Sequence, residues 1–351
     1  MENTRRFIID TDTGADDAWA IVEALRASGI ARVEAVTVVF GNFELDLCVK
    51  NALLAAEAAG TYVPPVYAGM ERAIMSRRMF RAEHVHGDDG LGGMRLPPPA
   101  HRAEEGHAVD AIIDLVMEHP GEIEIVTCGP LTNLAMACLK EPRLAGNVKR
   151  AWILGGTAGA RGNLPAAAEY NVGSDPEAAA IVLDAGFDAV WVTWDNARGD
   201  TEITPEEVER LLSCGSAAAR FCGLCSRDLA RFYEEKYGKK TFGVIDSMVM
   251  TAALFPETME EVFEADCAVE LCGRETRGYM RAEPCGMAGD GSFSGGTGGA
   301  VCEATGGSVS GGAGGAVCEA AGGAVSGGRT RLCTRMNAAE YKRKLFSLLG
   351  C

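Results

Sequence analysis

The chain has 351 residues, 47% of them hydrophobic, and a formal net charge of −16. Such a length provides enough apolar material for one large core, so we expect a single domain over residues 1–351. The strong negative charge argues against nucleic acid as a partner, because phosphate binding needs clustered Lys and Arg, and it leaves a small molecule as the better candidate.

The predicted elements alternate between strand and helix along the chain. Phe7 to Ile9 is a short apolar run that predicts a buried strand, and the apolar face of Ala15 to Arg26 predicts a helix. The same alternation continues in the strands expected at Val33 to Val39, Ile123 to Cys128, Arg150 to Leu154 and Ala189 to Trp194, and in the helices expected at Leu45 to Ala59, Leu131 to Leu139 and Pro176 to Leu183. Continuously apolar strands separated by helices are typical of parallel sheets. We therefore predict an α/β fold with an open, mostly parallel, Rossmann-like sheet flanked by helices.

Residues 286–328 differ from the rest of the chain in composition. Glycine is concentrated there, and the heptapeptide Gly-Gly-Ala-Val-Cys-Glu-Ala begins at Gly298 and again at Gly314. Such a repeat has few large apolar side chains with which to offset the entropy of ordering. It predicts a flexible low-complexity insertion, with a Gly-rich β-solenoid turn as the alternative. The amphipathic segment Ala338 to Leu349 then predicts a closing helix.

Thirteen cysteines occur at irregular spacing in this long chain. Their odd number favours reduced thiols over a disulfide framework. Cys222 and Cys225 are a close pair, but no second pair or nearby His accompanies them, so they do not indicate a zinc site. We find no apolar leader and no run long enough to span a membrane, and we expect a cytoplasmic protein without membrane contact.

Four carboxylates follow the first predicted strand within eight residues: Asp10, Asp12, Asp16 and Asp17. So dense a group of anions repels itself unless a cation lies among them, and oxygen ligands suit Ca²⁺ or Mg²⁺. A helix N-terminus would account for Asp16 and Asp17 alone. The segment therefore predicts a metal site at the carboxyl end of a strand, where open α/β sheets bind ligands.

Further polar residues follow other predicted strands and should reach the same edge of the sheet. They are Asn42, the segment Gly129 to Asn133, Asn163, the segment Glu169 to Asn171, and Asp246. Carboxamides and carboxylates in this number can donate to and accept from vicinal hydroxyls. A sugar is the ligand that this chemistry favours.

These segments resemble motifs of the inosine-uridine preferring nucleoside hydrolases. Asp10 to Asp17 is similar to the family's DxDPGxDD signature, and Val39 to Asn42 is similar to its VxGN. Further resemblance lies in His86 to Gly92, Gly129 to Asn133 and Glu169 to Asn171, so the motifs run in the family's order from the N-terminus to about Phe255.

The resemblance implies a Ca²⁺-dependent N-ribohydrolase that splits a nucleoside into ribose and free base, and it favours a homodimer or homotetramer. It implies calcium ligands at Asp10, Asp12, Asp17, the backbone carbonyl of Cys128, and Asp246. Asp12 would also be the general base. It implies substrate contacts from Asp16, Asn42, Asn163, Glu169, Asn171 and Asp246, with His86 on the ribose or base side.

The chain departs from the family pattern in three places. Thr13 replaces a Pro that stiffens the turn, and Cys128 replaces a Thr, a change that a backbone carbonyl ligand tolerates. Ile245 stands where many members carry the His that gives a proton to the departing base. Either Tyr233 or Tyr237 could supply a hydroxyl instead, or both could simply pack in a helix. We expect slow turnover or a preference for purine nucleosides.

Two other readings of the sequence give different functions. The residues Asp10 and Asp12 also match the DxDxT motif of haloacid dehalogenase-type phosphatases, where they would be nucleophile and acid/base. That family gives no role to Asn163, Glu169 or Asn171. Alternatively, the chain is a nucleoside- or ribose-binding protein whose turnover was lost with Ile245.

Overall fold

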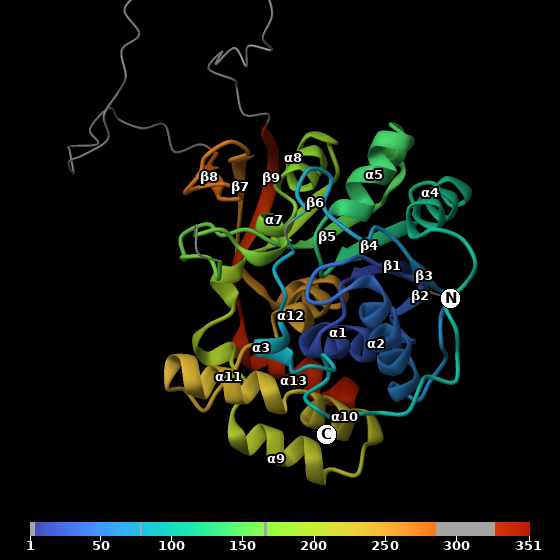
Figure 1. Cartoon of the computed structure of the whole chain (residues 1–351), viewed down its shortest axis with the longest axis vertical. Coiled ribbons are helices and arrows are strands. Elements are labelled where there is room, and N and C mark those ends of the chain that lie inside the picture. The colour runs from blue at the N-terminus through green and yellow to red at the C-terminus, as the bar shows by residue number, and fades with distance from the viewer. Residues whose placement is uncertain (1–3, 78, 165–166, 286–326) are drawn as a thin grey trace, which may run out of the picture.

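The computed structural model describes residues 4–77, 79–164, 167–285 and 327–351. Its centre is a nine-stranded sheet with the strand order β3-β2-β1-β4-β5-β6-β9-β7-β8 (Figure 1). The strands are β1 Arg5–Thr11, β2 Ala31–Val38, β3 Val66–Ala68, β4 Ile123–Thr127, β5 Arg150–Leu154, β6 Ala189–Val192, β7 Met259–Val269, β8 Met280–Pro284 and β9 Gly327–Met336. Seven neighbouring strands, from β3 to β9 in this order, pair in parallel. The predicted α/β class with a mostly parallel sheet is confirmed.

Helices cover both faces of the sheet (Figure 1). They are α1 Ala15–Arg26, α2 Leu45–Ala58, α3 Glu83–His86, α4 Ala108–Glu118, α5 Thr132–Lys140, α6 Leu144–Asn147, α7 Tyr170–Ser174, α8 Pro176–Asp184, α9 Pro205–Ser213, α10 Ala217–Cys225, α11 Arg227–Tyr237, α12 Ile245–Leu254 and α13 Ala338–Leu349. Alternate residues of β1 enter different cores: Phe7 and Ile9 pack with α1, α2 and α12, whereas Ile8 packs with α4, α5 and α8. This is the period of two that a strand imposes on its side chains, and it explains why β1 is apolar throughout.

The order of the strands reverses between β1 and β4. From β1 the chain continues to β2 and β3 on one side, and from β4 it continues to β5 and β6 on the other. The loops after β1 and β4 therefore separate and leave a crevice at the carboxyl ends of the strands. The segments that carry Asp12 and Cys128 both lie at this point.

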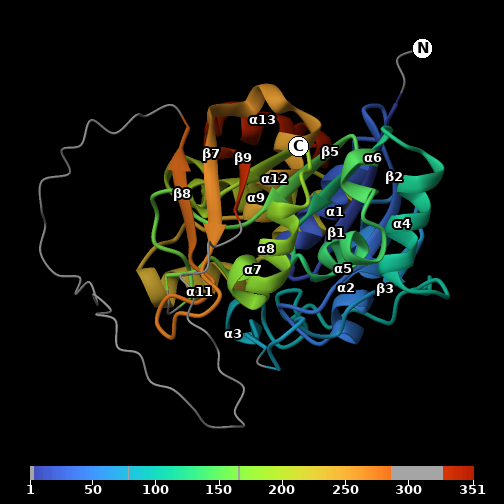
Figure 2. The same cartoon turned by 90° about the horizontal axis from the view of Figure 1, so that it is seen from above.

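The far end of the sheet is antiparallel, and the sequence did not predict it. There β7 pairs antiparallel with both β9 and β8, and Figure 2 shows these strands at the end away from β2. Most of the predicted Gly-rich insertion, residues 286–326, lies outside the described residues. Gly327 and Gly328, the last two residues of the predicted insertion, are the start of β9, where Gly327 pairs with Ala268 and Gly328 pairs with Cys267.

One cysteine pair corrects the prediction of reduced thiols. Cys214, just after α9, is bonded to Cys351, with Cα atoms 5.5 Å apart across a sequence separation of 137 residues. Helix α13, which has the predicted bounds, brings the C-terminus beside α9. Spacing along the chain cannot reveal such a contact, because the fold creates it. Cys222 and Cys225 are buried free thiols in α10.

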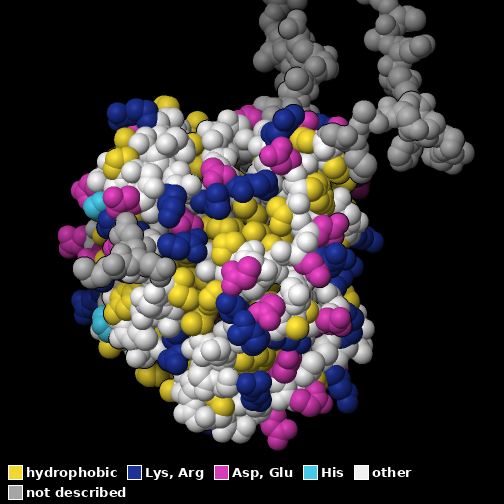
Figure 3. Space-filling view, turned by 180° about the vertical axis from the view of Figure 1, so that it is seen from behind, with side chains coloured by type: hydrophobic (Ala, Val, Ile, Leu, Met, Phe, Trp, Pro, Cys, Tyr) yellow, Lys and Arg dark blue, Asp and Glu magenta, His cyan; other side chains and the backbone are white. Residues whose placement is uncertain are grey.

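Within the described residues, no helix combines the length and apolarity that crossing a bilayer would need. On the face in Figure 3, acidic and basic side chains are interspersed around a central group of hydrophobic ones. That face offers no continuous basic surface of the kind that phosphate backbones require.

Candidate active site

A cavity of about 500 Å³ lies at the carboxyl ends of the central strands. Its size falls within the range of small-molecule sites. Its lining includes nine of the residues predicted to act in the site: Asp12, Asp16, Asn42, His86, Cys128, Asn163, Glu169, Asn171 and Asp246. The other two predicted residues, Asp10 and Asp17, are buried and do not line it. The fold thus brings together side chains from six separate segments.

The four clustered acids lie on different local structures. Asp10 is part of β1, Asp12 lies in the turn, and both Asp16 and Asp17 are in the first turn of α1. The prediction that the strand ends at Ile9, before all four acids, was therefore wrong for Asp10. The difference arises because Asp10 continues the parallel register between Thr37 of β2 and Thr127 of β4.

Neutral donors hold two of these acids from behind the cavity. Asp10 Oδ1 accepts hydrogen bonds from Thr37 Oγ1 at 2.6 Å and from Asn133 Nδ2 at 2.8 Å. Thr11 Oγ1 donates to Asp17 Oδ1 at 2.6 Å. Asn133 belongs to the Gly129 to Asn133 motif, but we had assigned it no role. It orients a predicted ligand, since it is fully buried and also donates to the carbonyl of Val38.

Burial raises the pKa of every acid in the cluster. The pKa of Asp10 rises to about 7 because burial outweighs its hydrogen bonds. That of Asp17 rises to about 6 through burial and the charge of Asp16. Both Asp12 and Asp246 have a pKa well above the ordinary value, again through burial first and then neighbouring carboxylates. A cation among these groups would reverse the effect, because it favours the charged forms.

The donor set fits a divalent cation. One ligand atom each of Asp17, Cys128 and Asp246 lie within 4.8 Å of one another, and metal–ligand bonds of about 2.0 to 2.6 Å would let them reach one ion. Asp10 Oδ2 and Asp246 Oδ1 are buried and have no hydrogen-bond partner among the described residues. Such orphaned oxygens are costly unless a ligand satisfies them. The predicted carbonyl ligand of Cys128 accepts a hydrogen bond from Asn171 Nδ2 at 2.8 Å, which leaves it a second lone pair.

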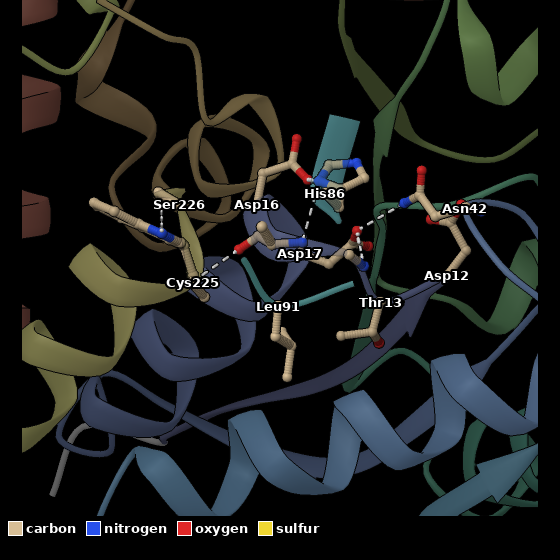
Figure 4. A network of polar contacts seen from close by, with 12 residues as sticks. Asp12, Thr13, Asp16, Asp17, Asn42, His86, Leu91, Cys225 and Ser226 are labelled. Carbon is tan, nitrogen blue, oxygen red and sulfur yellow. Dashed lines mark hydrogen bonds and ion pairs between the residues drawn. The ribbon is translucent and has the colours of Figure 1, made fainter. Parts of the chain in front are cut away.

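Asn42 and His86 lie beside the clustered acids (Figure 4). The backbone N–H of Asn42 donates to Asp12 Oδ2 at 2.7 Å, and its side chain donates to Asp17 Oδ2 at 3.3 Å. His86 Nδ1 accepts from the backbone N–H of Ala15 at 3.3 Å, so a neutral ring carries its proton on Nε2. Burial lowers the pKa of His86 to about 4, which keeps the ring neutral at physiological pH.

The loop after β5 provides the three remaining predicted contacts. Glu169 is the N-cap of α7 and also accepts from the backbone N–H of Gly156 at 3.0 Å, so it fixes both ends of this loop. Burial raises its pKa to about 7. Asn171 Nδ2 donates to the carbonyls of Cys128 and Leu154. Asn163 Oδ1 is buried and has no hydrogen-bond partner among the described residues, so it is available to accept a hydrogen bond from a ligand.

Aromatic side chains line the end of the cavity near α11. Ile245 is 5% exposed and begins α12 beside Asp246. Tyr233 is buried, and its hydroxyl lies close to the backbone of Gly243. Tyr237 is 49% exposed. Phe232 and Lys236 also line this end, with the ammonium 4.7 Å from the ring centroid.

Trp194 is a lining residue that sequence reasoning missed. It follows β6, and its buried indole Nε1 has no hydrogen-bond partner in the part of the chain that the structure describes. Its backbone N–H donates to the carbonyl of Gly156, which places it beside the loop that Glu169 holds. An indole N–H can only donate. Nothing in the sequence distinguished this Trp from a core residue.

Comparison with known proteins identifies the family. The family model for inosine-uridine preferring nucleoside hydrolase matches residues 7–297. A probable uridine nucleosidase 2 from Oryza sativa subsp. japonica is 37% identical over 72% of this chain and 74% of its own length. The inosine-uridine preferring nucleoside hydrolase of Leishmania major is 35% identical over 80% of this chain and 90% of its own. A solved plant nucleoside hydrolase superposes with a TM-score of 0.83 at 28% identity, covering 99% of this chain and 100% of that one. The chain belongs to the inosine-uridine preferring nucleoside hydrolase family and is a hydrolase of N-glycosyl bonds.

Proposed function

We propose that the protein is a calcium-dependent N-ribohydrolase that converts a ribonucleoside and water into ribose and free base. The observation that carries the proposal is the convergence of nine predicted site residues on one cavity. Asp12, Asp16, Glu169 and Asp246 supply carboxylates there, and Asn42, Asn163 and Asn171 supply carboxamides. This chemistry suits a polyhydroxylated ring that gains positive charge in the transition state.

Asp12 is the general base in this proposal. Its carboxylate lines the cavity, and the backbone N–H of Asn42 holds Oδ2 in place. It removes a proton from the water that attacks the anomeric carbon. Calcium, when bound, supplies a Lewis acid that lowers the pKa of a water molecule. Direct attack by water predicts inversion at the anomeric carbon.

The sugar lies against the loop after β5 and against the start of α1 and α12. Asp16 Oδ1, Asn163 Oδ1 and Asp246 Oδ1 are buried acceptors that have no hydrogen-bond partner within the described part of the chain, so each can accept from a sugar hydroxyl. His86 Nε2–H faces the same cavity as a neutral donor. The base then occupies the end lined by Ile245 and the aromatic side chains of α11.

The test is a panel of nucleosides that includes inosine and uridine, with base release followed by chromatography. We expect release in calcium, none after EGTA treatment, and recovery when calcium returns. Asp12→Asn should lower kcat by at least ~10²-fold, the range for loss of a general base. Full activity without metal would refute the calcium requirement, and an unchanged Asp12→Asn would refute the base.

The binding-protein alternative makes a different prediction in the same experiment. A protein that has lost turnover would show a nucleoside-dependent rise in melting temperature without any base release. Membership of the nucleoside hydrolase family removes the reason for the phosphatase alternative, since the match to the family model covers residues 7–297.

A further inference from the structure

Cys128 places a thiol within the candidate metal site. The residue directly follows β4, and its side chain is 2% exposed. Its Sγ and one carboxylate oxygen each of Asp17 and Asp246 lie within 4.8 Å of one another. Among the described residues this is the one group of three such side chains. A second observation also indicates a ligand here, because Asp246 Oδ1 is buried and no residue that the structure describes forms a hydrogen bond with it.

Sulfur and oxygen ligands favour different cations. Ca²⁺ takes oxygen ligands, so a backbone carbonyl at position 128 would suit it and the thiol would not. A thiolate with two carboxylates suits thiophilic ions of the zinc group. Thr at this position would offer no sulfur. The side chain of Cys128 therefore adds a property that the oxygen atoms of the site do not have.

The nearby thiol of Cys48 is arranged differently. Its Sγ donates to the backbone carbonyl of Asp12 at 3.1 Å and to that of Phe43 at 3.5 Å. Cys225 Sγ donates to the carbonyl of Cys222 within α10. These thiols have backbone partners, whereas Cys128 Sγ is grouped with two carboxylates. Position in the fold therefore singles out Cys128 among the buried thiols near the cavity.

We infer that Cys128, Asp17 and Asp246 form a binding site for a thiophilic divalent cation such as Zn²⁺ or Cd²⁺, which competes with Ca²⁺. On binding, the thiol loses its proton to solvent and a sulfur–metal bond forms. The competition with Ca²⁺ rests on the proposed function, because it assumes that calcium uses the same two carboxylates. A cation held by Cys128 takes the place of the calcium that the proposed reaction requires, so Zn²⁺ should inhibit turnover.

Cd²⁺ is the probe, because a cadmium–thiolate bond has its own ultraviolet charge-transfer absorption. We would titrate Cd²⁺ into the calcium-free, full-length protein and into two variants. Cys128→Thr removes the sulfur, and Cys138→Ser is the matched control at a half-buried thiol of α5. We expect a saturable band in the unmodified protein and in Cys138→Ser. Cys128→Thr should lose that component and weaken Cd²⁺ binding at least about tenfold, as loss of metal-supporting residues does.

Calcium then tests whether the two ions share the site. Added Ca²⁺ should remove the Cys128-dependent band, and a calcium-induced rise in melting temperature should persist in Cys128→Thr, which shows that the variant is folded. An unchanged band in Cys128→Thr, or a band that calcium does not displace, would overturn the inference. Absence of nucleosidase activity alongside a Cys128-dependent band would instead count against the proposed function alone.

Discussion

A side-chain carbon at position 41 would lie 2.0 Å from Oδ2 of Asp12, so the backbone of Gly41 closes directly on this carboxylate. On its other side, a side-chain carbon at Gly129 would lie 2.9 Å from Asp12 Oδ1. The N–H of Asn42 holds Oδ2 at 2.7 Å. The Asp12 carboxylate thus lies between the segments that follow β2 and β4. Positions 41 and 129 need glycine because their backbones pack so closely against this carboxylate that a side chain would collide with it.

Gly41→Ala should displace the carboxylate of Asp12 and lower kcat/KM by ~10²-fold, the cost of a misplacement of about 1 Å. Gly29→Ala is the matched control, because no atom lies within 4 Å of the added carbon there. Steady-state kinetics and melting temperatures of both variants provide the measurement. Normal kinetics in a folded Gly41→Ala protein would show that Asp12 need not hold this position.

Trp194→Phe tests whether the unpartnered indole N–H serves the substrate. Its removal should raise KM by up to about tenfold, the worth of one hydrogen bond, with kcat less affected. Stability should stay unchanged or rise, because a buried unsatisfied donor is lost. Trp152→Phe is the opposite case: its Nε1 donates to Glu124 at 2.9 Å, so that variant should lose stability and keep its KM. An unchanged KM in Trp194→Phe would leave the indole without a role in binding.

Ile245→His should raise uridine hydrolysis relative to inosine hydrolysis by at least about tenfold, part of the 10²- to 10⁴-fold that general acids contribute. A purine can take a proton at N7 from a bridging water, whereas a pyrimidine has no equivalent ring nitrogen and needs a local donor. The position lines the cavity, so an imidazole there can reach the base. Ile245→Asn is the control with a polar side chain that cannot donate a proton. If the unmodified protein already prefers uridine, the reasoning from Ile245 fails.

The sequence allowed the central parallel strands to be predicted, but not β3 and β9, which also pair in parallel. The bounds of α1, β5 and α13 agree with the prediction, because each shows a clear apolar period or run between breakers. The antiparallel strands escaped prediction for a physical reason. In β7, residues Glu260, Glu261 and Val262 are exposed, so about half of this long strand lacks a continuous apolar signal.

The site was predictable wherever a motif marked it, and not where tertiary contact creates it. Asp12 and Asn42 stand in recognisable segments, and both line the cavity. Trp194 and the Cys214–Cys351 pair depend on packing between elements far apart in sequence. The support that Asn133 gives Asp10 spans 123 residues. Spacing along the chain carries no information about such pairs.

Residues 286–326 should be dispensable for catalysis, because they contain none of the residues assigned to ribose or metal. The two flanking strands lie on opposite sides of β7: Pro284 pairs with Ala265, and Gly327 pairs with Ala268. Because β8 and β9 run in the same direction, a linker that replaces the segment must pass over β7 from the end of β8 to the start of β9. Such a crossover connection takes about a dozen residues. A Gly-Ser linker of that length should leave melting temperature and kcat/KM nearly unchanged. A large loss of either would assign the segment a role in folding or in the site.

Glu23 should make the protein less stable as pH rises from about 4.5 to 8. It is fully buried in α1 and accepts from Ser247 Oγ at 2.7 Å and Thr251 Oγ1 at 2.5 Å of α12. Burial raises its pKa from 4.5 to about 8 despite these bonds.

In that window the folded state keeps a proton that the unfolded state has released, so the contribution of Glu23 falls by at most about 1.4 kcal/mol per pH unit. Glu23→Gln imitates the protonated acid and removes this titration. The stability of Glu23→Gln relative to the unmodified protein should therefore rise by up to about 4 kcal/mol between pH 5 and pH 8. Its relative melting temperature should rise by several °C over the same range and change little above it. The exposed Glu275→Gln variant should show no such trend. If the difference in melting temperature between Glu23→Gln and the unmodified protein stays constant with pH, Glu23 is already ionised at pH 5. That result would contradict the expectation that burial raises its pKa.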